Sequence, residues 1–492
     1  MRRWRLAALG LVSVLMTAAC GLRAPAQDVR AARRAAVGSG SARTAGLSAG
    51  SEAASAGVSG GGAADSATPG AAGGTAAASS AGTVAGGSSA GPAAPSSATG
   101  NGAAAPAPPG GNGGATDIGV TATSITAGNI SDLGGPVPGL FQGGPYGTQA
   151  YFDYINSQGG VYGRKLQLKV NDDQLDCSQN QAEYQNLVNQ VFAFVGSWSL
   201  NDSCGAQVLA AHPVPAIQQA LSTQFQKLPG SFSVNPYNAG APTGYFEYFK
   251  AKYPDAIKSV GTIVGNQASA VQSWKYFKAT MESLGYVIKY EDYFPPAQSN
   301  FTADVIRMRQ AGIKMVFILA VNAPDLAIFS QEAHQQGWKP DVFVAPIGYF
   351  GSYISQAGGP EVVEGQWMPV VQAMFLGEDA ASVPEVALFD KWIKQGFPNF
   401  PIDQFASTSW SNAALFVEAL KKAGPQITRA KLLAAISQIH SYGDNGMFPD
   451  IDVASKKNGN CYLLLKIHNG KYTKVDTPSK GFRCDGTYHF VS

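Results

Sequence analysis

Two hydroxyl groups and an indole ring follow a short apolar run at Ser197, Trp198 and Ser199, and together they can bind a small polar or aromatic molecule. The run, residues 191–195, has no polar alternation, which is typical of a strand buried on both faces. Such strands form parallel sheets, in which ligands bind beyond the carboxyl ends of the strands. Residues 196–199 are therefore a candidate binding loop, and an ordinary connecting loop is the alternative.

Four of the five cysteines have a spacing that suits disulfide bonds in an oxidising compartment. We expect Cys177 to pair with Cys204 and Cys461 with Cys484, because each of these pairings would tie loops within one region of the chain. Metal ligation is the rival interpretation, but the chain contains no C-x-x-C pair. The sequence predicts no metal site and no cofactor.

Catalytic motifs are missing from the globular part of the sequence. Residues 116–492 contain no G-x-S-x-G, no H-E-x-x-H, no Walker A loop and no dinucleotide fingerprint. The acidic loop of Asp172, Asp173 and Asp176 lacks the ligand and glycine pattern of a calcium loop, so solvated loop charges are the favoured interpretation. The sequence therefore favours a protein that is not an enzyme.

Composition divides the chain of 492 residues into two parts. Residues 1–115 are mostly Ala, Gly, Ser, Thr and Pro, whereas residues 116–492 have the composition of a globular protein. Basic residues outnumber acidic ones only in the first part, so the formal net charge of +2 hides a slightly acidic globular part. This charge gives no reason to expect nucleic-acid binding.

The N-terminus resembles an export signal. Arg2, Arg3 and Arg5 precede an apolar stretch, residues 6–16, that is too short to span a bilayer. The Thr-Ala-Ala-Cys that follows resembles the lipobox of bacterial lipoproteins, in which the cysteine, here Cys20, becomes the acylated first residue. We expect an extracytoplasmic protein that is lipid-anchored to the bacterial cell membrane. Ordinary secretory cleavage is the alternative.

Short apolar runs then alternate with helical periodicities, in two series of βα units. The first series has predicted strands at 125–130, 166–170, 191–195 and 214–217, and predicted helices at 147–157, at 178–190 with Ser178 as N-cap, and near Ala206. The second has predicted strands at 259–264, 286–290, 315–320 and 342–345, and predicted helices at 271–284, 301–310 and 325–335. A helix at 411–422 and a strand at 462–468 follow. Two such lobes would leave a cleft between the carboxyl ends of their sheets.

Several motifs resemble those of type I periplasmic binding proteins, specifically the branched-chain amino-acid-binding family of ABC-importer substrate-binding proteins. The motifs are Ala-Gly-Asn-Ile at 127–130, Ile-Asn-x-x-Gly-Gly-Val-x-Gly-Arg-Lys at 155–165, Asp-Asp at 172–173, Phe-Val-Gly at 194–196 and Tyr-Phe-Pro-Pro at 293–296. The resemblance implies an α/β fold of two similar lobes of parallel-sheet βα units with a ligand cleft between them. It also implies closure of the lobes by hinge bending, the motion known for periplasmic binding proteins.

The domain organisation follows from this resemblance and from the composition. We expect a lipoprotein signal peptide at 1–20, a disordered tether at 21–115 and a substrate-binding domain at 116–492. Within that domain the expected segments are about 116–238 and 369–458 for lobe 1, and about 239–368 and 459–492 for lobe 2.

In this family the loops at 196–199 and 220–222 would hold a ligand carboxylate through backbone amides and hydroxyl groups. The candidate residues in these loops are Ser197, Trp198, Ser199, Ala220 and Ser222. For the serines, helix capping or turn formation is the alternative. In lobe 2 the candidates are polar residues that follow predicted strands, namely Gln267, Ser269 and Asn322.

One position departs from the family. Amino-acid-binding members have a glutamate in lobe 2 that pairs with the ligand ammonium, and Ile347 stands there in this chain. Because a buried ammonium without a counter-charge is costly, Asp132 is the expected substitute carboxylate. Otherwise the ligand is less charged or more apolar, with Phe141 and Tyr349 near the rim of the cleft. The alternative is that these aromatic residues are lobe core.

The function that these features favour is an extracytoplasmic solute-binding protein of an ABC importer. It would capture a small organic solute, amino-acid-like, an amide or an aromatic or apolar acid, and deliver it to membrane permease and ATPase subunits. We expect a monomer that binds no nucleic acid. A ligand-binding sensory receptor lipoprotein of the same fold is the alternative, and an extracytoplasmic hydrolase is the third hypothesis.

Overall fold

The computed structural model describes residues 105–236, 239–478 and 481–491. The expected signal peptide, Cys20 and the tether up to residue 104 lie outside the described residues. None of the helices in the described part combines the length and the hydropathy that a bilayer span requires.

Five parallel strands form the sheet of lobe 1, in the order β2-β1-β3-β4-β5. The middle strand, β3 (Ala193–Val195), is shorter than the predicted strand at 191–195. Ala193 and Val195 join the core on one face of the sheet and Phe194 joins the core on the other, which confirms a strand buried on both faces. The other strands are β1 (Ser124–Ser131), β2 (Lys165–Asp172), β4 (Ala216–Ile217) and β5 (Ser231–Phe232).

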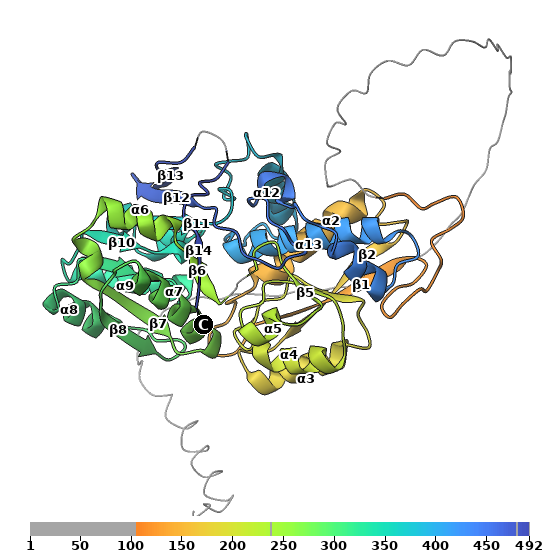
Figure 1. Cartoon of the computed structure of the whole chain (residues 1–492), viewed down its shortest axis with the longest axis horizontal. Coiled ribbons are helices and arrows are strands. Elements are labelled where there is room, and N and C mark those ends of the chain that lie inside the picture. Colours follow the sequence, from red (N-terminus) through yellow and green to blue (C-terminus); the bar gives the residue numbers. More distant parts are fainter. Residues whose placement is uncertain (1–104, 237–238, 479–480, 492) are drawn as a thin grey trace, which may run out of the picture. The chain divides into compact units, whose positions relative to one another are not determined.

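Helices cover both faces of this sheet, with α2 and α13 in one core and α3 and α4 in the other. Figure 1 shows α12 and α13, which come late in the sequence, lying beside α2. Asp176, and not the expected Ser178, caps α3, because its carboxylate accepts the backbone N–H of Gln179. The helices are α2 (Gly143–Ser157), α3 (Cys177–Leu187), α4 (Asp202–Ala211), α5 (Thr223–Gln226), α12 (Pro384–Gly396), α13 (Gln404–Ala423) and α14 (Arg429–Ile436).

Lobe 2 contains a seven-stranded sheet in the order β13-β12-β11-β10-β9-β7-β8. The strands from β8 to β11 are parallel, and β12 and β13 add an antiparallel edge that the sequence did not predict. Asn469 and Gly470 connect this hairpin with positive φ values of 49° and 71°, as an Asn-Gly turn requires. The strands are β7 (Val260–Gly265), β8 (Ile288–Phe294), β9 (Met315–Phe317), β10 (Val342–Val344), β11 (Trp367–Val370), β12 (Leu463–His468) and β13 (Lys471–Lys474).

The helices of lobe 2 are mostly those between its parallel strands. They are α6 (Gly244–Lys252), α7 (Ala268–Ser283), α8 (Thr302–Gln310), α9 (Ala323–Gln335), α10 (Tyr353–Gln356) and α11 (Pro360–Val363). Three short 3-10 helices complete the described elements, namely η1 (Ala256–Lys258), η2 (Pro346–Gly348) and η3 (Asp444–Gly446).

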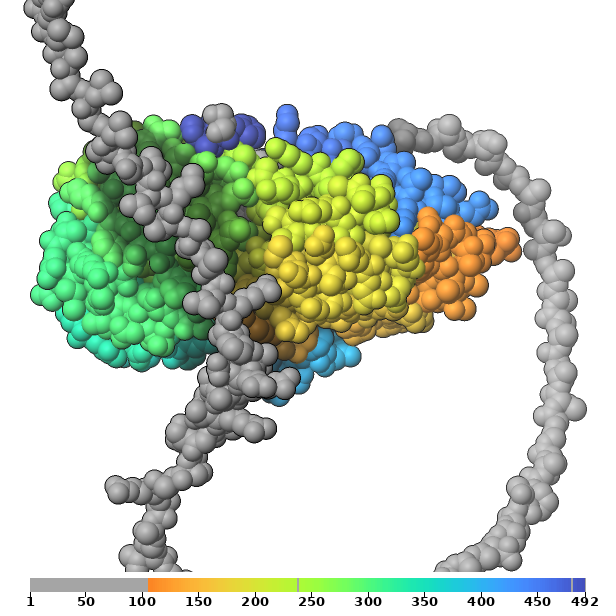
Figure 2. Space-filling model, turned by 90° about the horizontal axis from the view of Figure 1, so that it is seen from below, coloured from red at the N-terminus to blue at the C-terminus, as the bar shows by residue number. Residues whose placement is uncertain are grey.

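The chain crosses between the lobes after β5, after β11 and before β12. A third small sheet, made of β6 (Gly240–Pro242) and β14 (Tyr488–Phe490), pairs the first crossing with the C-terminal segment. Figure 2 shows the two lobes side by side, with early residues of lobe 1 in orange to yellow and residues of lobe 2 in green to cyan. Both lobes belong to one compact unit.

Residues 105–115 are part of this fold, which corrects the predicted end of the tether. Arg164 is fully buried and donates hydrogen bonds to the carbonyl groups of Asn112, at 2.6 Å, and Gly114, at 2.9 Å. The backbone N–H of Tyr162 donates to the carbonyl of Ala105. A buried guanidinium needs acceptors, so the Gly-Arg-Lys motif fixes the end of the low-complexity segment on lobe 1.

The two expected disulfide bonds are present. Cys177–Cys204 joins the start of α3 to α4, and Cys461–Cys484 joins the segment before β12 to the segment before β14. Each closes a loop whose cross-linking contributes about 3 to 4 kcal/mol in the chain-entropy model. Among the described residues, no three metal-ligating side chains gather at one point.

Candidate functional site

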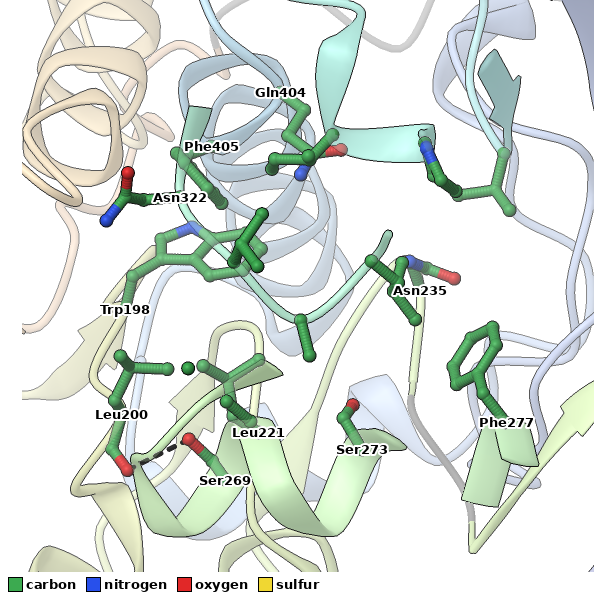
Figure 3. A pocket seen from close by; sticks show the side chains of 18 of the residues that line it. Trp198, Leu200, Leu221, Asn235, Ser269, Ser273, Phe277, Asn322, Gln404 and Phe405 are labelled. Carbon is green, nitrogen blue, oxygen red and sulfur yellow. Dashed lines mark hydrogen bonds between the residues drawn. The ribbon is translucent and has the colours of Figure 1, made fainter. Parts of the chain in front are cut away.

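A cavity of about 200 Å³ lies between the two lobes (Figure 3). Lobe 1 contributes Trp198, Leu200 and Leu221 to its lining, and lobe 2 contributes Ala270 and Ile347. Most of the lining is apolar, and no described Lys, Arg or His side chain belongs to it. The cavity therefore suits a ligand with a large apolar part.

Trp198 forms an aromatic wall at one end of the cavity. Its ring lies 5.6 Å from that of Phe141 and 4.9 Å from that of Phe405, between centroids. Its indole N–H donates to Ser409 Oγ at 2.9 Å, and this hydroxyl group donates to the carbonyl of Gly196. Helix α13 therefore fixes the loop at the end of β3. This contact between α13 and the loop could not be predicted from the sequence.

The serines of the first candidate loop lie outside the lining. Ser197 Oγ accepts the backbone N–H of Ile130 at 3.1 Å, and Ser199 Oγ accepts the backbone N–H of Asn201 at 3.0 Å. Both side chains are almost fully buried. They join β3 to β1 and shape the turn into α4, which matches the turn-forming alternative.

The second candidate loop is also directed into lobe 1. Ser222 Oγ caps α5 by accepting the backbone N–H of Phe225, and Ala220 lines a separate small cavity. The buried carboxylate of Asp202 accepts the backbone N–H groups of Leu221, at 2.6 Å, and Ser222, at 3.0 Å. In this loop the side chain of Leu221 is the one that faces the main cavity (Figure 3).

Asp132 was expected to face the cavity, but its side chain points into lobe 1. Its carboxyl oxygens contact the backbone N–H of Leu200, at 2.9 Å, and Ser199 Oγ, at 3.4 Å. Burial, reinforced by the hydrogen bond to Asp173 and the charge of Asp173, raises the pKa of Asp132 to about 10. A carboxyl group that is protonated at neutral pH and lies inside lobe 1 cannot neutralise a ligand ammonium.

Four of the five lobe 2 candidates line the cavity, namely Gln267, Ser269, Asn322 and Ile347. Gln267 precedes α7, and Ser269 Oγ donates across the cleft to the carbonyl of Leu200 at 3.0 Å. Asn322 caps α9 by accepting the backbone N–H of Asp325.

Tyr349 lies outside the lining and is part of the lobe core. Its hydroxyl group donates to Glu378 at 2.7 Å, and its ring packs on Phe375 and Tyr472. The residue is almost fully buried, which matches the alternative that some of these aromatic residues are lobe core.

Asp325 is a lining residue that the sequence reasoning missed. It is the only carboxyl group among the described lining residues, and its side chain is 6% exposed. Its Oδ2 accepts Asn322 Nδ2 at 2.6 Å, whereas Oδ1 has no hydrogen-bond partner among the described residues. Burial raises the pKa of Asp325 to about 7. The Asn-x-x-Asp spacing at the start of α9 signals helix capping, but nothing in it signals a cavity.

Hydrogen bonds also join the lobes beside the cavity. The backbone N–H of Thr223 donates to Gln272 Oε1 at 3.1 Å, and the hydroxyl groups of Thr223 and Tyr276 lie 2.9 Å apart. Thr223 opens α5 in lobe 1, and its two partners lie on α7 in lobe 2. Together with the bond from Ser269 to Leu200, these contacts hold the two lobes against each other along α7.

Comparison with known families agrees with this architecture. The family described as periplasmic binding protein matches residues 124–471. The chain belongs to this family. Its two lobes and parallel sheets are those of the type I, branched-chain amino-acid-binding group.

Similar proteins share the fold at low sequence identity. Leu/Ile/Val-binding protein homolog 7 of Brucella abortus is 22% identical over 314 residues, which cover 61% of this chain and 78% of that protein. A fatty acid ABC transporter substrate-binding protein from Thermomonospora curvata is 19% identical, with a TM-score of 0.61 over 77% of this chain and 97% of that one. The isoleucine complex of LivJ from Streptococcus pneumoniae is 15% identical, with a TM-score of 0.59 over 72% of this chain and 100% of that one.

Proposed function

We propose that this protein is the extracytoplasmic solute-binding protein of an ABC importer and that its ligand is a small, predominantly apolar organic solute. The observation that carries the proposal is the cavity between the lobes, whose described lining is mostly apolar and contains no basic side chain. The solute would be captured as the lobes close and would be passed to permease and ATPase subunits in the membrane. The protein would act as a monomer, anchored through Cys20.

Two of the similar solved structures support an apolar ligand. One solved neighbour is described as a substrate-binding protein for a fatty acid and another binds isoleucine, and these two ligands share a hydrocarbon body. The lining of this cavity, with Trp198, Phe405 and Ile347, is suited to that shared part.

A free amino acid is disfavoured by the same lining. Its ammonium would meet Ile347 where the family has a glutamate, and Asp132 lies away from the cavity with its carboxyl group protonated. The one described carboxyl group in the lining, Asp325, has a pKa near neutrality and is therefore only partly charged there. A solute with one polar group or none fits these surroundings better than a zwitterion does.

The test is native mass spectrometry of the full-length protein isolated from the cells that make it, followed by identification of any molecule released on unfolding. We expect a single apolar organic compound, which should also raise the melting temperature of protein that has been unfolded and refolded without it. A protein that carries no compound and that no fraction of a cell extract stabilises would contradict the proposal.

Crosslinking in membranes tests the role of the protein. Capture of permease subunits supports import, whereas capture of a signalling protein would support the sensory receptor instead. A control reaction on protein whose solute has been removed shows whether the capture depends on the bound state.

A further inference from the structure

The end of the cavity on the side opposite to Trp198 is here called the rear chamber. Its walls are Pro242, Tyr245, Phe277, Tyr462 and Tyr488. These residues come from the crossings between the lobes, from helices α6 and α7, and from the C-terminal strand β14. A ligand that ended in the cleft would not reach them.

Helix α7 gives the length of the combined cavity. Ser269, Ser273 and Phe277 all line it, and they stand four and eight residues apart on one face of the helix. At 1.5 Å per residue, the lining follows α7 for about 12 Å. Figure 3 shows Phe277 on the side of the cavity opposite to Trp198. The cavity is therefore longer than the side chain of a branched-chain amino acid.

The two ends differ in chemistry. The cleft end carries Asn322 and Asp325, with the partner-free Oδ1 of Asp325 as an available polar contact. The rear chamber is bounded mainly by the rings of Phe277, Tyr245, Tyr462 and Tyr488, and the buried hydroxyl group of Tyr462 has no hydrogen-bond partner among the described residues. These rings offer a broad contact area to a tail, and Asp325 offers a polar contact to a head group.

The rear wall is built into the fold, because β14 is hydrogen-bonded to β6 in the first crossing. The backbone N–H of Thr243 donates to the carbonyl of Thr487 at 2.8 Å, and Tyr488 stands opposite Pro242 in the pairing. Gly240 has a φ of 149°, and a Cβ there would lie 1.9 Å from the carbonyl oxygen of His489. Only glycine permits this close approach of the two strands.

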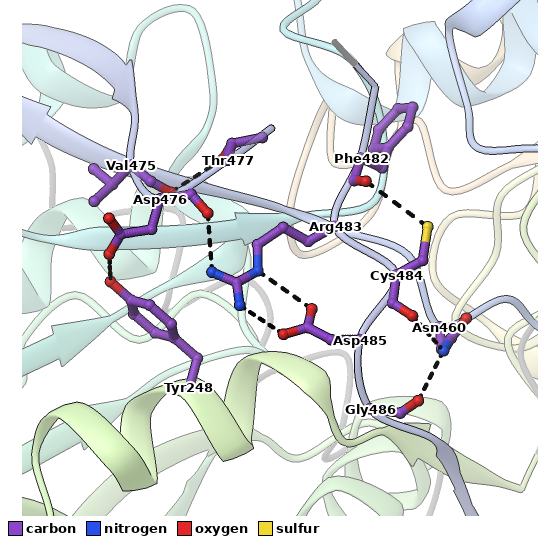
Figure 4. Close-up of polar contacts among 10 residues, drawn as sticks. All are labelled: Tyr248, Asn460, Val475, Asp476, Thr477, Phe482, Arg483, Cys484, Asp485 and Gly486. Atoms are coloured by element: carbon purple, nitrogen blue, oxygen red, sulfur yellow. Dashed lines mark hydrogen bonds and ion pairs between the residues drawn. The ribbon is translucent and has the colours of Figure 1, made fainter. Parts of the chain in front are cut away.

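Side chains and a disulfide brace the same segment (Figure 4). Arg483 donates to both carboxylate oxygens of Asp485, at 3.2 and 2.6 Å, and to the carbonyl of Asp476 at 2.9 Å. Asn460 Nδ2 donates to the carbonyl groups of Cys484 and Gly486, next to the Cys461–Cys484 bond. The rear chamber is thus bounded on this side by a braced segment.

We propose that the rear chamber binds the hydrocarbon tail of an extended amphiphile, whose polar head lies in the cleft beside Asn322. The unbranched tail runs along α7 past Ser273 and ends between Phe277 and Tyr488. This inference rests on the proposed function and names its substrate class. A compact solute would leave the chamber unfilled and would forfeit the contacts that its walls offer.

Chain length is the variable that tests this inference. Straight-chain carboxylic acids from butanoate to dodecanoate, and the primary amides of the same chains, are titrated calorimetrically into the solute-free full-length protein. We expect affinity to rise about fourfold with each added methylene and to stop rising once the tail fills the chamber. Equal affinity for short and long chains, or binding by no member of either series, would overturn the inference.

Two substitutions on α7 should move the preferred chain length in opposite directions. Ser273→Phe places a ring in the path of the tail and should lower the affinity for the longest chains by more than tenfold while sparing the shortest. Phe277→Ala opens the far end and should extend the preferred length. The matched control, Lys275→Phe, places the same ring on the exposed face of α7 and should leave the preference unchanged.

The two variants should shift the preferred chain length in opposite directions. A folding defect cannot imitate this result, because a damaged fold does not lengthen the preferred chain. An unchanged preference in both cavity variants would overturn the inference. If native mass spectrometry instead finds a short, compact solute, the rear chamber is not a tail site but the proposed function stands. If the protein takes up no solute at all, both fail.

Discussion

The two lobes use polar side chains differently where they meet. In lobe 1, Ser197, Ser199 and Asp202 make hydrogen bonds within the lobe and leave Trp198 and Leu221 to face the cavity. In lobe 2, the polar side chains that follow the strands belong to the lining themselves, as Ser269 and its neighbours show. A polar residue at a strand end is therefore not by itself a ligand contact.

The reason for the difference lies in how each loop is supported. In lobe 1 the loop after β3 lies between β1, α4 and α13, so its polar groups are surrounded by backbone donors and must be satisfied there. In lobe 2 the corresponding polar residues stand at the first turns of α7 and α9 and line the cavity, although the Asn322 side chain also caps α9. Substitutions in lobe 1 should therefore lower stability, and substitutions in lobe 2 should alter binding.

Trp198→Ala should have the largest effect, because Trp198 belongs to both the lobe 1 core and the cavity. The loss of its packing on Phe141 and Phe405 should lower the free energy of unfolding by about 3 kcal/mol. The affinity for the solute recovered from the protein should fall by more than tenfold, as measured by calorimetry. Unchanged affinity would show that the ligand lies elsewhere.

Asp202→Ala should destabilise lobe 1 without changing which solute is bound. It leaves the backbone N–H groups of Leu221 and Ser222 buried without their acceptor, at a cost of about 2 kcal/mol. Urea denaturation measures the loss. Asp202→Asn, which keeps one acceptor oxygen, should lose less. A change in solute preference rather than in stability would contradict the division between the lobes.

Asp325→Asn should change how stability depends on pH. The pKa of Asp325 is about 7 in the folded protein against an ordinary value of 3.8, so its contribution is fully present below about pH 4 and is lost as pH rises through 7. Relative to the wild type, the variant should gain stability above pH 7 and none below pH 4.

Thermal melting of the solute-free proteins at several pH values measures this difference. Asn322→Asp provides a control in the same helix turn, because it adds a carboxyl group where Asp325→Asn removes one, and it should act in the opposite direction. Parallel pH profiles of Asp325→Asn and the wild type would show that the carboxyl group is not desolvated by the cavity.

Ser269→Ala should have the smallest effect, and mainly on binding. It removes the hydrogen bond to Leu200 that joins the lobes, which is worth about 1 kcal/mol, or about fivefold in affinity. The unfolding free energy should change by less than half as much. Calorimetry measures the affinity and urea denaturation measures the unfolding free energy of the same samples. A loss of stability without a loss of affinity would show that this bond stabilises the fold and does not contribute to lobe closure.

Much of the fold follows from periodicity and motifs. The apolar run at 191–195 predicts a strand buried on both faces, and in the structure helices cover both faces of β3. The strand predicted at 462–468 is present as β12, but its antiparallel pairing with β11 and the pairing of β6 with β14 could not be predicted, because these pairings join segments far apart in the chain. The helix predicted at 411–422 is present within α13, but the contribution of its first residues, Gln404 and Phe405, to the cavity could not be predicted, because they lie more than two hundred residues after Trp198 in the chain.

The candidate site was predictable in position but not in side-chain direction. Trp198, Gln267, Asn322 and Ile347 were found from their places after strands. Ser197 was not distinguishable from them, because its partner Ile130 belongs to a different strand and the sequence does not reveal their contact. Asp325 was missed because its sequence signal is that of helix capping, and its burial depends on packing around the cavity that the sequence does not reveal.

The hydrogen bonds of Thr223 to Gln272 and Tyr276 bear on how long a solute stays bound. For a solute held in the cavity of the proposed binding protein, breaking these contacts as the lobes separate would be a step that limits its dissociation rate. The proposed membrane partner could then speed release by competing for the contacts of Thr223 and Ser269 that join the lobes. A binding protein of this kind would release its solute slowly in free solution and quickly on docking to its membrane partner.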